Sequence, residues 1–231
     1  MKVKKKKNPY RFGIFMLILF VLFTLAVKFI DVDHIGAKNS EIGFSTINSF
    51  FRDKLGYNAL CYGISKYFGY LVLLTACMFA LMGFIQLLRR RSIAKLDKNF
   101  ISLAIFYAAV AFVYVFFELF VINYRPVILD EGLEPSYPSS HTILAICIMG
   151  SAIVQFKRLF KDRKQRKTAN LTAMMICFIV VIFRFMSGVH WFTDIIGGII
   201  ISIGMVSIYN QAFIKIEIAN RRKLRKRNAL K

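Results

Sequence analysis

Six long apolar stretches divide the chain, and short charged segments separate them. A helix needs about twenty predominantly apolar residues to cross the hydrocarbon core of a membrane. The six stretches meet or approach this length. We therefore predict an all-α, polytopic membrane protein with six transmembrane helices, at about residues 12–30, 67–88, 100–122, 141–156, 171–187 and 192–213.

The segment between the first two predicted spans, residues 31–66, is mixed rather than apolar. Within it Phe44, Ile47, Phe51 and Leu55 recur at helical spacing, which is typical of an amphipathic helix. This pattern favours an interfacial helix that lies on the outer leaflet and could border a lipid entry path. An ordinary connecting loop is the alternative.

The basic residues predict the orientation of the chain. With six spans, 26 of the 33 Lys and Arg residues fall in four segments on one side of the membrane: 1–11, 89–98, 157–167 and 214–231. The positive-inside rule assigns these segments to the cytoplasm, so both termini, with their basic tails 1–11 and 214–231, are expected there. The net charge of +21 then indicates contact with anionic lipid head groups rather than with nucleic acid.

The composition, 57% hydrophobic, excludes an ordinary soluble domain and predicts one membrane-embedded domain over residues 1–231. The first apolar stretch has no convincing small-residue cleavage site and is long enough to span, so we expect a retained helix. The four cysteines have no metal-ligand spacing and are interpreted as apolar packing residues. The oligomeric state is left open.

Ionisable side chains where two predicted spans meet are a functional hypothesis, because a charge is costly at or near the hydrocarbon core. Arg184, His190 and Asp194 lie in such a place. If the chain is helical after Gly188, His190 and Asp194 share one helical face, where the carboxylate can orient the imidazole. Arg184 offers a fork of donors suited to phosphate oxygens. The alternative is a buried ion pair that only locks two helices.

A second polar group stands at the start of the fourth predicted span. Ser139, Ser140 and His141 follow a Pro-rich loop and enter a helix, whose first backbone amides form a natural anion site. Either serine could cap the helix or donate to a phosphate oxygen, and an interfacial histidine beside a capping serine is the alternative. The predicted topology puts Arg125, His141, His190 and Asp194 at the same extracytoplasmic face.

Two histidines, two arginines and an aspartate suit phosphoryl transfer without a metal or other cofactor. One histidine can attack phosphorus and form a phosphohistidine, while the other protonates the leaving oxygen and then activates water. Arginines and helix amides can stabilise the transferring group. No cluster of carboxylates suggests a bound magnesium ion, so we predict metal independence.

These residues resemble the signatures of the type 2 phosphatidic acid phosphatase family, whose soluble relatives include the vanadium haloperoxidases. The family has Lys, six residues and Arg-Pro; then Pro-Ser-Gly-His; then Ser-Arg, five residues, His, three residues and Asp. The chain matches them in order with Arg125-Pro126, with Pro138-Ser139-Ser140-His141, and with Arg184, His190 and Asp194. The six-span layout also matches.

The resemblance implies a role for each matched residue. His190 would be the nucleophile, Asp194 its orienting partner, and His141 the general acid and then the base. The phosphate would be bound by Arg125, Arg184, Ser139 and the backbone amide of Ser140. The substrates would be lipid phosphates or diphosphates at the outer face of a plasma membrane, with a polyprenyl diphosphate favoured and phosphatidate-type lipids close behind.

Three positions depart from the family pattern. Glu118 stands where the first signature has lysine, Phe183 replaces the serine before Arg184, and Ser140 replaces glycine. Glu118, two helical turns from Arg125 on one face, could pair with an arginine, be protonated by burial, or change substrate preference. In the last case Lys54 or Lys66 would supply the missing charge.

Two other functions stay open. The same phosphohistidine could pass its phosphoryl group to another lipid, which would make the protein a phosphotransferase. Glu118 and Phe183 favour a different class, a non-catalytic protein that binds or moves lipids, whereas the presence of His141, His190 and Asp194 favours an enzyme.

Overall fold

The computed structural model describes residues 8–129 and 132–229, and within them the chain is helical, with β-pairing confined to isolated bridges. The helices are α1 (Arg11–Phe29), α2 (Ser45–Leu55), α3 (Ala59–Arg90), α4 (Lys98–Leu119), α5 (Ser140–Leu159), α6 (Arg163–Met186) and α7 (Phe192–Ala229), with short 3₁₀ turns at Ala37–Asn39 and Ile93–Lys95. All except α2 are long and apolar enough to cross a membrane. The predicted all-α fold with six spans is confirmed for these residues. The lysines of the two basic tails at positions 2, 4–7 and 231 lie outside them.

Several helices extend beyond the predicted spans because polar caps, and not the ends of the apolar runs, fix where they begin. α3 starts eight residues before position 67, after Asn58, whose side chain accepts a hydrogen bond from the Cys61 amide. α6 starts eight residues before position 171, after Asp162, whose carboxylate accepts from the amides of Lys164 and Gln165. The apolar runs therefore predicted only the inner parts of α3 and α6, and each helix begins earlier, directly after its capping residue.

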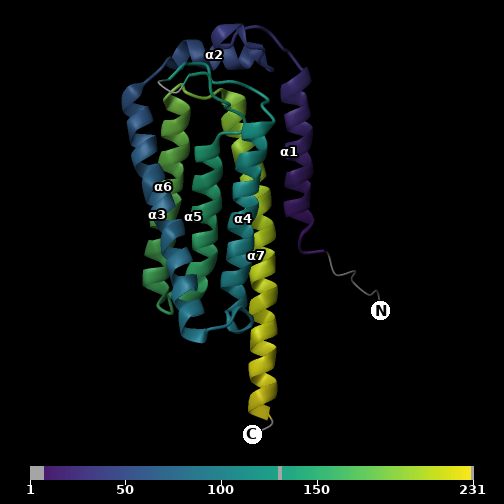
Figure 1. The fold of residues 1–231 in the computed structure, drawn as a ribbon, viewed down its shortest axis with the longest axis vertical. Helices are drawn as coiled ribbons and strands as arrows, with labels where there is room; N and C mark the ends of the chain where they lie inside the picture. Colours follow the sequence, from purple (N-terminus) through teal and green to yellow (C-terminus); the bar gives the residue numbers. More distant parts are fainter. Residues whose placement is uncertain (1–7, 130–131, 230–231) are drawn as a thin grey trace.

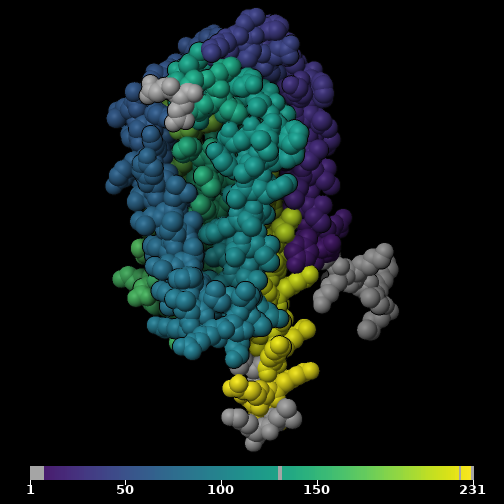
Figure 2. All heavy atoms as spheres, viewed as in Figure 1, coloured from purple at the N-terminus to yellow at the C-terminus, as the bar shows by residue number. Residues whose placement is uncertain are grey.

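The bundle is built around α5 and α7. In the most apolar 18-residue stretch of each of these two helices, 56% is buried inside the protein. In the other four candidate spans the share is 11–17%, because their apolar side chains face outward. Figure 1 shows α3 to α7 running side by side, α1 beside α7, and α2 lying across one end. In Figure 2 the surface is hollowed between α3 and α4, where atoms of α5 are visible. Side chains on the first turns of α5 and α7 are therefore held by the most buried helices.

The predicted amphipathic segment does form a helix, α2, and a polar side chain lies on the face that it buries in the protein. Ile47 is 39% exposed, whereas the polar Asn48 is buried. The side-chain NH₂ group of Asn48 donates to Gly43 O (2.8 Å) and to Thr193 Oγ1 (3.0 Å). The side-chain oxygen of Asn48 accepts from the backbone amide of Thr193 (3.2 Å). Phe51 stacks on Phe192 at 4.5 Å between ring centroids. Polar and aromatic contacts with the start of α7 thus decide which face of α2 turns inward.

Candidate active site

His190 and Asp194 meet at the start of α7, although not as two residues of one helix. The helix begins at Phe192, so the expectation that both lie on one helical face is wrong. The Asp194 carboxylate folds back over the first turn and accepts a hydrogen bond from the Trp191 amide (2.9 Å), as an acidic residue at the third helical position can. The same oxygen lies 3.5 Å from His190 Nδ1, at ion-pair separation. The Asp194 carboxylate that caps α7 is therefore also the partner of His190.

The turn before His190 needs a glycine. Gly188 has φ +68°, and a Cβ atom on it would lie 1.8 Å from the carbonyl oxygen of Gly56. The Asn58 amide also donates to the carbonyl of Ser187 (3.0 Å). The turn between α6 and α7 is therefore pressed against the start of α3, and this contact aims His190 into the bundle.

Asp194 also ties three segments together. It is fully buried, and Asn123 lies with its amide 3.4 Å from Oδ1. The backbone amide of Ser139 donates to the Asp194 carbonyl (3.0 Å), and the Trp191 indole donates to Tyr124 O (2.7 Å). The loop after α4, the start of α5 and the start of α7 are consequently fixed relative to one another.

The start of α5 leaves several donors free of the helix. Ser139 occupies the N-cap position, but its side chain makes no capping bond; its hydroxyl accepts from Thr142 Oγ1 (3.1 Å), and its own proton is available to donate. The first hydrogen bond of the helical ladder runs from Ile143 N to Ser139 O. The amides of Ser140, His141 and Thr142 precede it, as at any helix start. His141 lies in the first turn, as expected, and this group of donors suits an anion.

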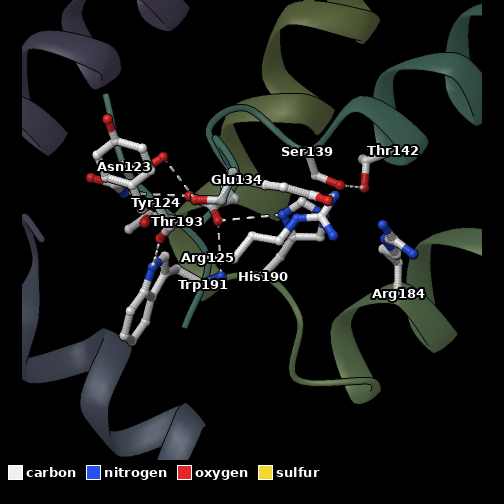
Figure 3. Close-up of polar contacts among 12 residues, drawn as sticks. Asn123, Tyr124, Arg125, Glu134, Ser139, Thr142, Arg184, His190, Trp191 and Thr193 are labelled. Atoms are coloured by element: carbon white, nitrogen blue, oxygen red, sulfur yellow. Dashed lines mark hydrogen bonds and ion pairs between the residues drawn. The ribbon is translucent and has the colours of Figure 1, made fainter. Parts of the chain in front are cut away.

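The two arginines differ in their surroundings. Arg184, in the last turn of α6, is 1% exposed, with its guanidinium 5.1 Å from the Tyr62 ring centroid, and its Nε and Nη1 have no hydrogen-bond partner in the described part of the chain. Arg125 donates from Nη2 to Glu134 Oε2 (2.7 Å). Figure 3 shows Arg125, Arg184, His190 and the Ser139 hydroxyl pointing toward one another.

Charge and burial set the protonation state of His190. Burial, then the positive charges of Arg184 and Arg125, then His141, lower the pKa of His190 well below its ordinary value of 6.5. Neither ring nitrogen has a hydrogen-bond partner among residues 8–129 and 132–229. The imidazole is therefore neutral at neutral pH, which is the form that can attack an electrophile.

Glu118 lies near this group but does not hold Arg125. α4 ends at Leu119, so the expectation that the two residues share a helical face is wrong, and the carboxylate partner of Arg125 is Glu134. Glu118 is exposed, interacts with Tyr114, and lines a cavity of about 20 Å³ together with Ser140 and His190. This position is compatible with an influence on substrate preference.

The sequence did not point to two residues that contact the candidate site, Tyr62 beside Arg184 and Asn123 beside Asp194. The helix-start signal of Asn58 would have placed Tyr62 on a helix rather than in a loop. No local pattern marked Asn123, because its partner is 71 residues away. In the described ranges, no three His, Cys, Asp or Glu side chains are grouped so that they could hold a metal ion. Metal independence stays a prediction.

Comparisons with known proteins give two matches. Residues 119–217 match the model of the PAP2 superfamily. A solved structure, described as the first transmembrane PAP2 type phosphatidylglycerolphosphate phosphatase from Bacillus subtilis, is similar with a TM-score of 0.59 and 17% identity, over 91% of this chain and 96% of that one. A search of curated proteins found no match. The residues from Arg125 to Asp194 all lie within the matched range.

Proposed function

We propose that the chain is a member of the PAP2 superfamily and that it hydrolyses lipid phosphates or diphosphates through a phosphohistidine, without a metal ion. The observation that carries this proposal is the meeting of a neutral, buried His190 with Asp194 and with two arginines. In the described part of the chain, buried guanidinium nitrogens of both arginines have no hydrogen-bond partner. A tetrahedral phosphate can take hydrogen bonds from several such donors at once.

The proposed reaction uses each side chain for one task. Asp194 holds the proton of His190 on Nδ1, so that the lone pair of Nε2 attacks phosphorus. The bond from phosphorus to the leaving oxygen breaks, and His141 gives that oxygen a proton. His141 then takes a proton from water, which attacks the phosphohistidine and releases phosphate. Arg125, Arg184, the Ser139 hydroxyl and the amides that begin α5 stabilise the charge on the phosphoryl oxygens.

We further propose that the protein is one domain in the plasma membrane with its site on the extracytoplasmic side. The candidate residues lie at the end of the bundle that α2 covers, whereas α7 runs to the opposite end, as Figure 1 shows. Its last turns carry Arg221, Arg222, Lys223, Arg225, Lys226 and Arg227. A cytoplasmic position of this basic end, and so of both termini, supports an outward-facing site.

The first test is phosphate release by the purified protein in detergent with EDTA present. The panel would contain a polyprenyl diphosphate, phosphatidate and phosphatidylglycerol phosphate. We expect release from at least one of them, with a rate that EDTA leaves unchanged, because the proposed chemistry needs no Lewis acid. Loss of activity in EDTA that returns with a divalent cation would contradict the metal-independent mechanism. Phosphoryl groups recovered on a second lipid instead of in solution would indicate phosphotransfer.

A second test concerns Glu118. Glu118→Lys replaces an anion near Ser140 and His190 with the cation that the family signature has. Because Glu118 is exposed and its charge is screened by solvent, we expect the ratio of kcat/KM values between two lipid substrates to change by only roughly threefold. Glu41→Lys makes the same change of charge at an exposed position in the segment before α2 and serves as the control. A ratio that shifts equally in both variants would make Glu118 a bystander.

A further inference from the structure

One face of α3 forms a side wall of the candidate site. Tyr62 and Lys66 are four residues apart, and Gly69 and Tyr70 follow one turn later, so they share a helical face. Tyr62 lies against the Arg184 guanidinium. Gly69 lies against His141, since a Cβ atom on this glycine would be 3.4 Å from the imidazole Cδ2 and 3.9 Å from Nε2. The start of α3 therefore contacts both the arginine and the second histidine.

Lys66 shares a cavity with His141. The cavity has a volume of about 50 Å³, and Lys66, Gly69, Tyr70 and His141 are among its lining residues. Glu118 and His190, by contrast, line a different cavity, beside the loop that precedes α5. The chain thus has a cation on the His141 side and a carboxylate near His190.

Lys54 is the other lysine that could replace the positive charge of the first family signature, where this chain has Glu118, but its side chain has a different partner. It lies in the last turn of α2 with its ammonium 4.7 Å from the ring centroid of Phe50, on its own helix. It is not among the residues that line the cavities at His141 or His190. It therefore provides a matched control, an exposed lysine at the same end of the bundle.

We propose that Lys66 binds the leaving group of the substrate, and that it favours lipid diphosphates, whose leaving group is itself a phosphate. The inference rests on the proposed function, in which His141 protonates the leaving oxygen. A cation beside the acid lies where that group departs, not where the phosphoryl group is transferred. An alcohol leaving group, as in phosphatidate, has no charge for this ammonium to neutralise once it is protonated.

The bonds of the proposed step balance as follows. His190 Nε2 forms a bond to the terminal phosphorus, and the bond from this phosphorus to the bridging oxygen breaks. The bridging oxygen takes the electron pair of that bond and the proton of His141, and it leaves as part of a lipid monophosphate. Lys66 transfers no proton; its ammonium pairs with the oxygens of the departing phosphate, and charge-assisted pairs of this kind are stronger than neutral ones.

The test compares two substrates with the same tail, farnesyl diphosphate and farnesyl phosphate, on Lys66→Gln, Lys66→Arg and Lys54→Gln. We expect Lys66→Gln to lower kcat/KM about tenfold for the diphosphate, as for a lost charged hydrogen bond, and less than threefold for the monophosphate. Lys66→Arg should keep most of the activity, and Lys54→Gln should change neither rate. Equal losses on both substrates, or no loss on either, would overturn the proposal.

A binding measurement keeps this proposal separate from the proposed reaction. In the His190→Ala background, which has no nucleophile, inorganic pyrophosphate should raise Tm more than orthophosphate does, and Lys66→Gln should remove the difference. Suppose that the protein hydrolysed no lipid, but that pyrophosphate raised Tm more than orthophosphate in His190→Ala and no longer did so once Lys66→Gln was added. The proposed function would then fail, while Lys66 remained a ligand of the second phosphate. An unchanged difference in Lys66→Gln would refute the role of Lys66 whatever the activity.

Discussion

His190→Ala should abolish lipid phosphate hydrolysis while leaving the protein folded. Loss of the nucleophile removes the covalent route altogether, so we expect phosphate release to fall by about 10⁴-fold or more. The free energy of unfolding should change little, because neither ring nitrogen has a hydrogen-bond partner in the described part of the chain. A change of ~1 kcal/mol corresponds to a shift in Tm of roughly 2–4 °C for a chain of this size. Both quantities can be measured on the same detergent-purified sample.

The control for this variant is His34→Ala. His34 lies before α2, with its side chain 56% exposed and 3.8 Å from the Glu41 carboxylate. It should leave both activity and Tm unchanged. An active His190→Ala variant would rule out the phosphohistidine mechanism, and an inactive variant that also unfolds would assign His190 a structural role instead.

Asp194→Asn should be almost as damaging as loss of the histidine itself. One oxygen of Asp194 both accepts from the Trp191 amide (2.9 Å) and lies 3.5 Å from His190 Nδ1. An asparagine oxygen in that place would keep the cap of α7 but would carry no negative charge to stabilise the histidine as it becomes positive. An asparagine NH₂ group there would instead favour the histidine tautomer with the proton on Nε2. That proton blocks the attacking lone pair. A wrong tautomer of this kind lowers kcat by about 10³–10⁴-fold in a histidine-centred site.

A matched control exists for this exchange as well. Asp31 is also a carboxylate that accepts from a helix N-terminal amide, that of Thr46 in α2, and this bond is the main reason that its pKa lies below the ordinary value. Asp31→Asn should leave turnover unchanged. Retention of more than about a tenth of the activity by Asp194→Asn, with Tm preserved, would show that the carboxylate does not orient the histidine.

The sequence was enough to locate the membrane-spanning helices along the chain, because helix formation in a membrane depends on local chemistry. Long apolar runs have to be helical to satisfy their backbone groups in lipid, and this requirement fixed six spans without reference to any contact. The ends of the spans were predicted less accurately: hydropathy does not detect a cap, so residues 59–66, the first turns of α3, were left outside the predicted span that begins at position 67. The spacing of Arg184, His190 and Asp194 likewise placed these residues in one hypothesis, and His190 and Asp194 do lie 3.5 Å apart.

What the sequence determined by itself is therefore the set of helices and the residue types at their ends. Only the tertiary structure decided which groups meet. Glu134 rather than Glu118 pairs with Arg125 because α4 ends at Leu119 and the chain turns back. Lys66 comes to His141 because α3 packs beside α5, 75 residues later in the chain. Such contacts depend on how buried faces fit together, and no short stretch of sequence carries that information.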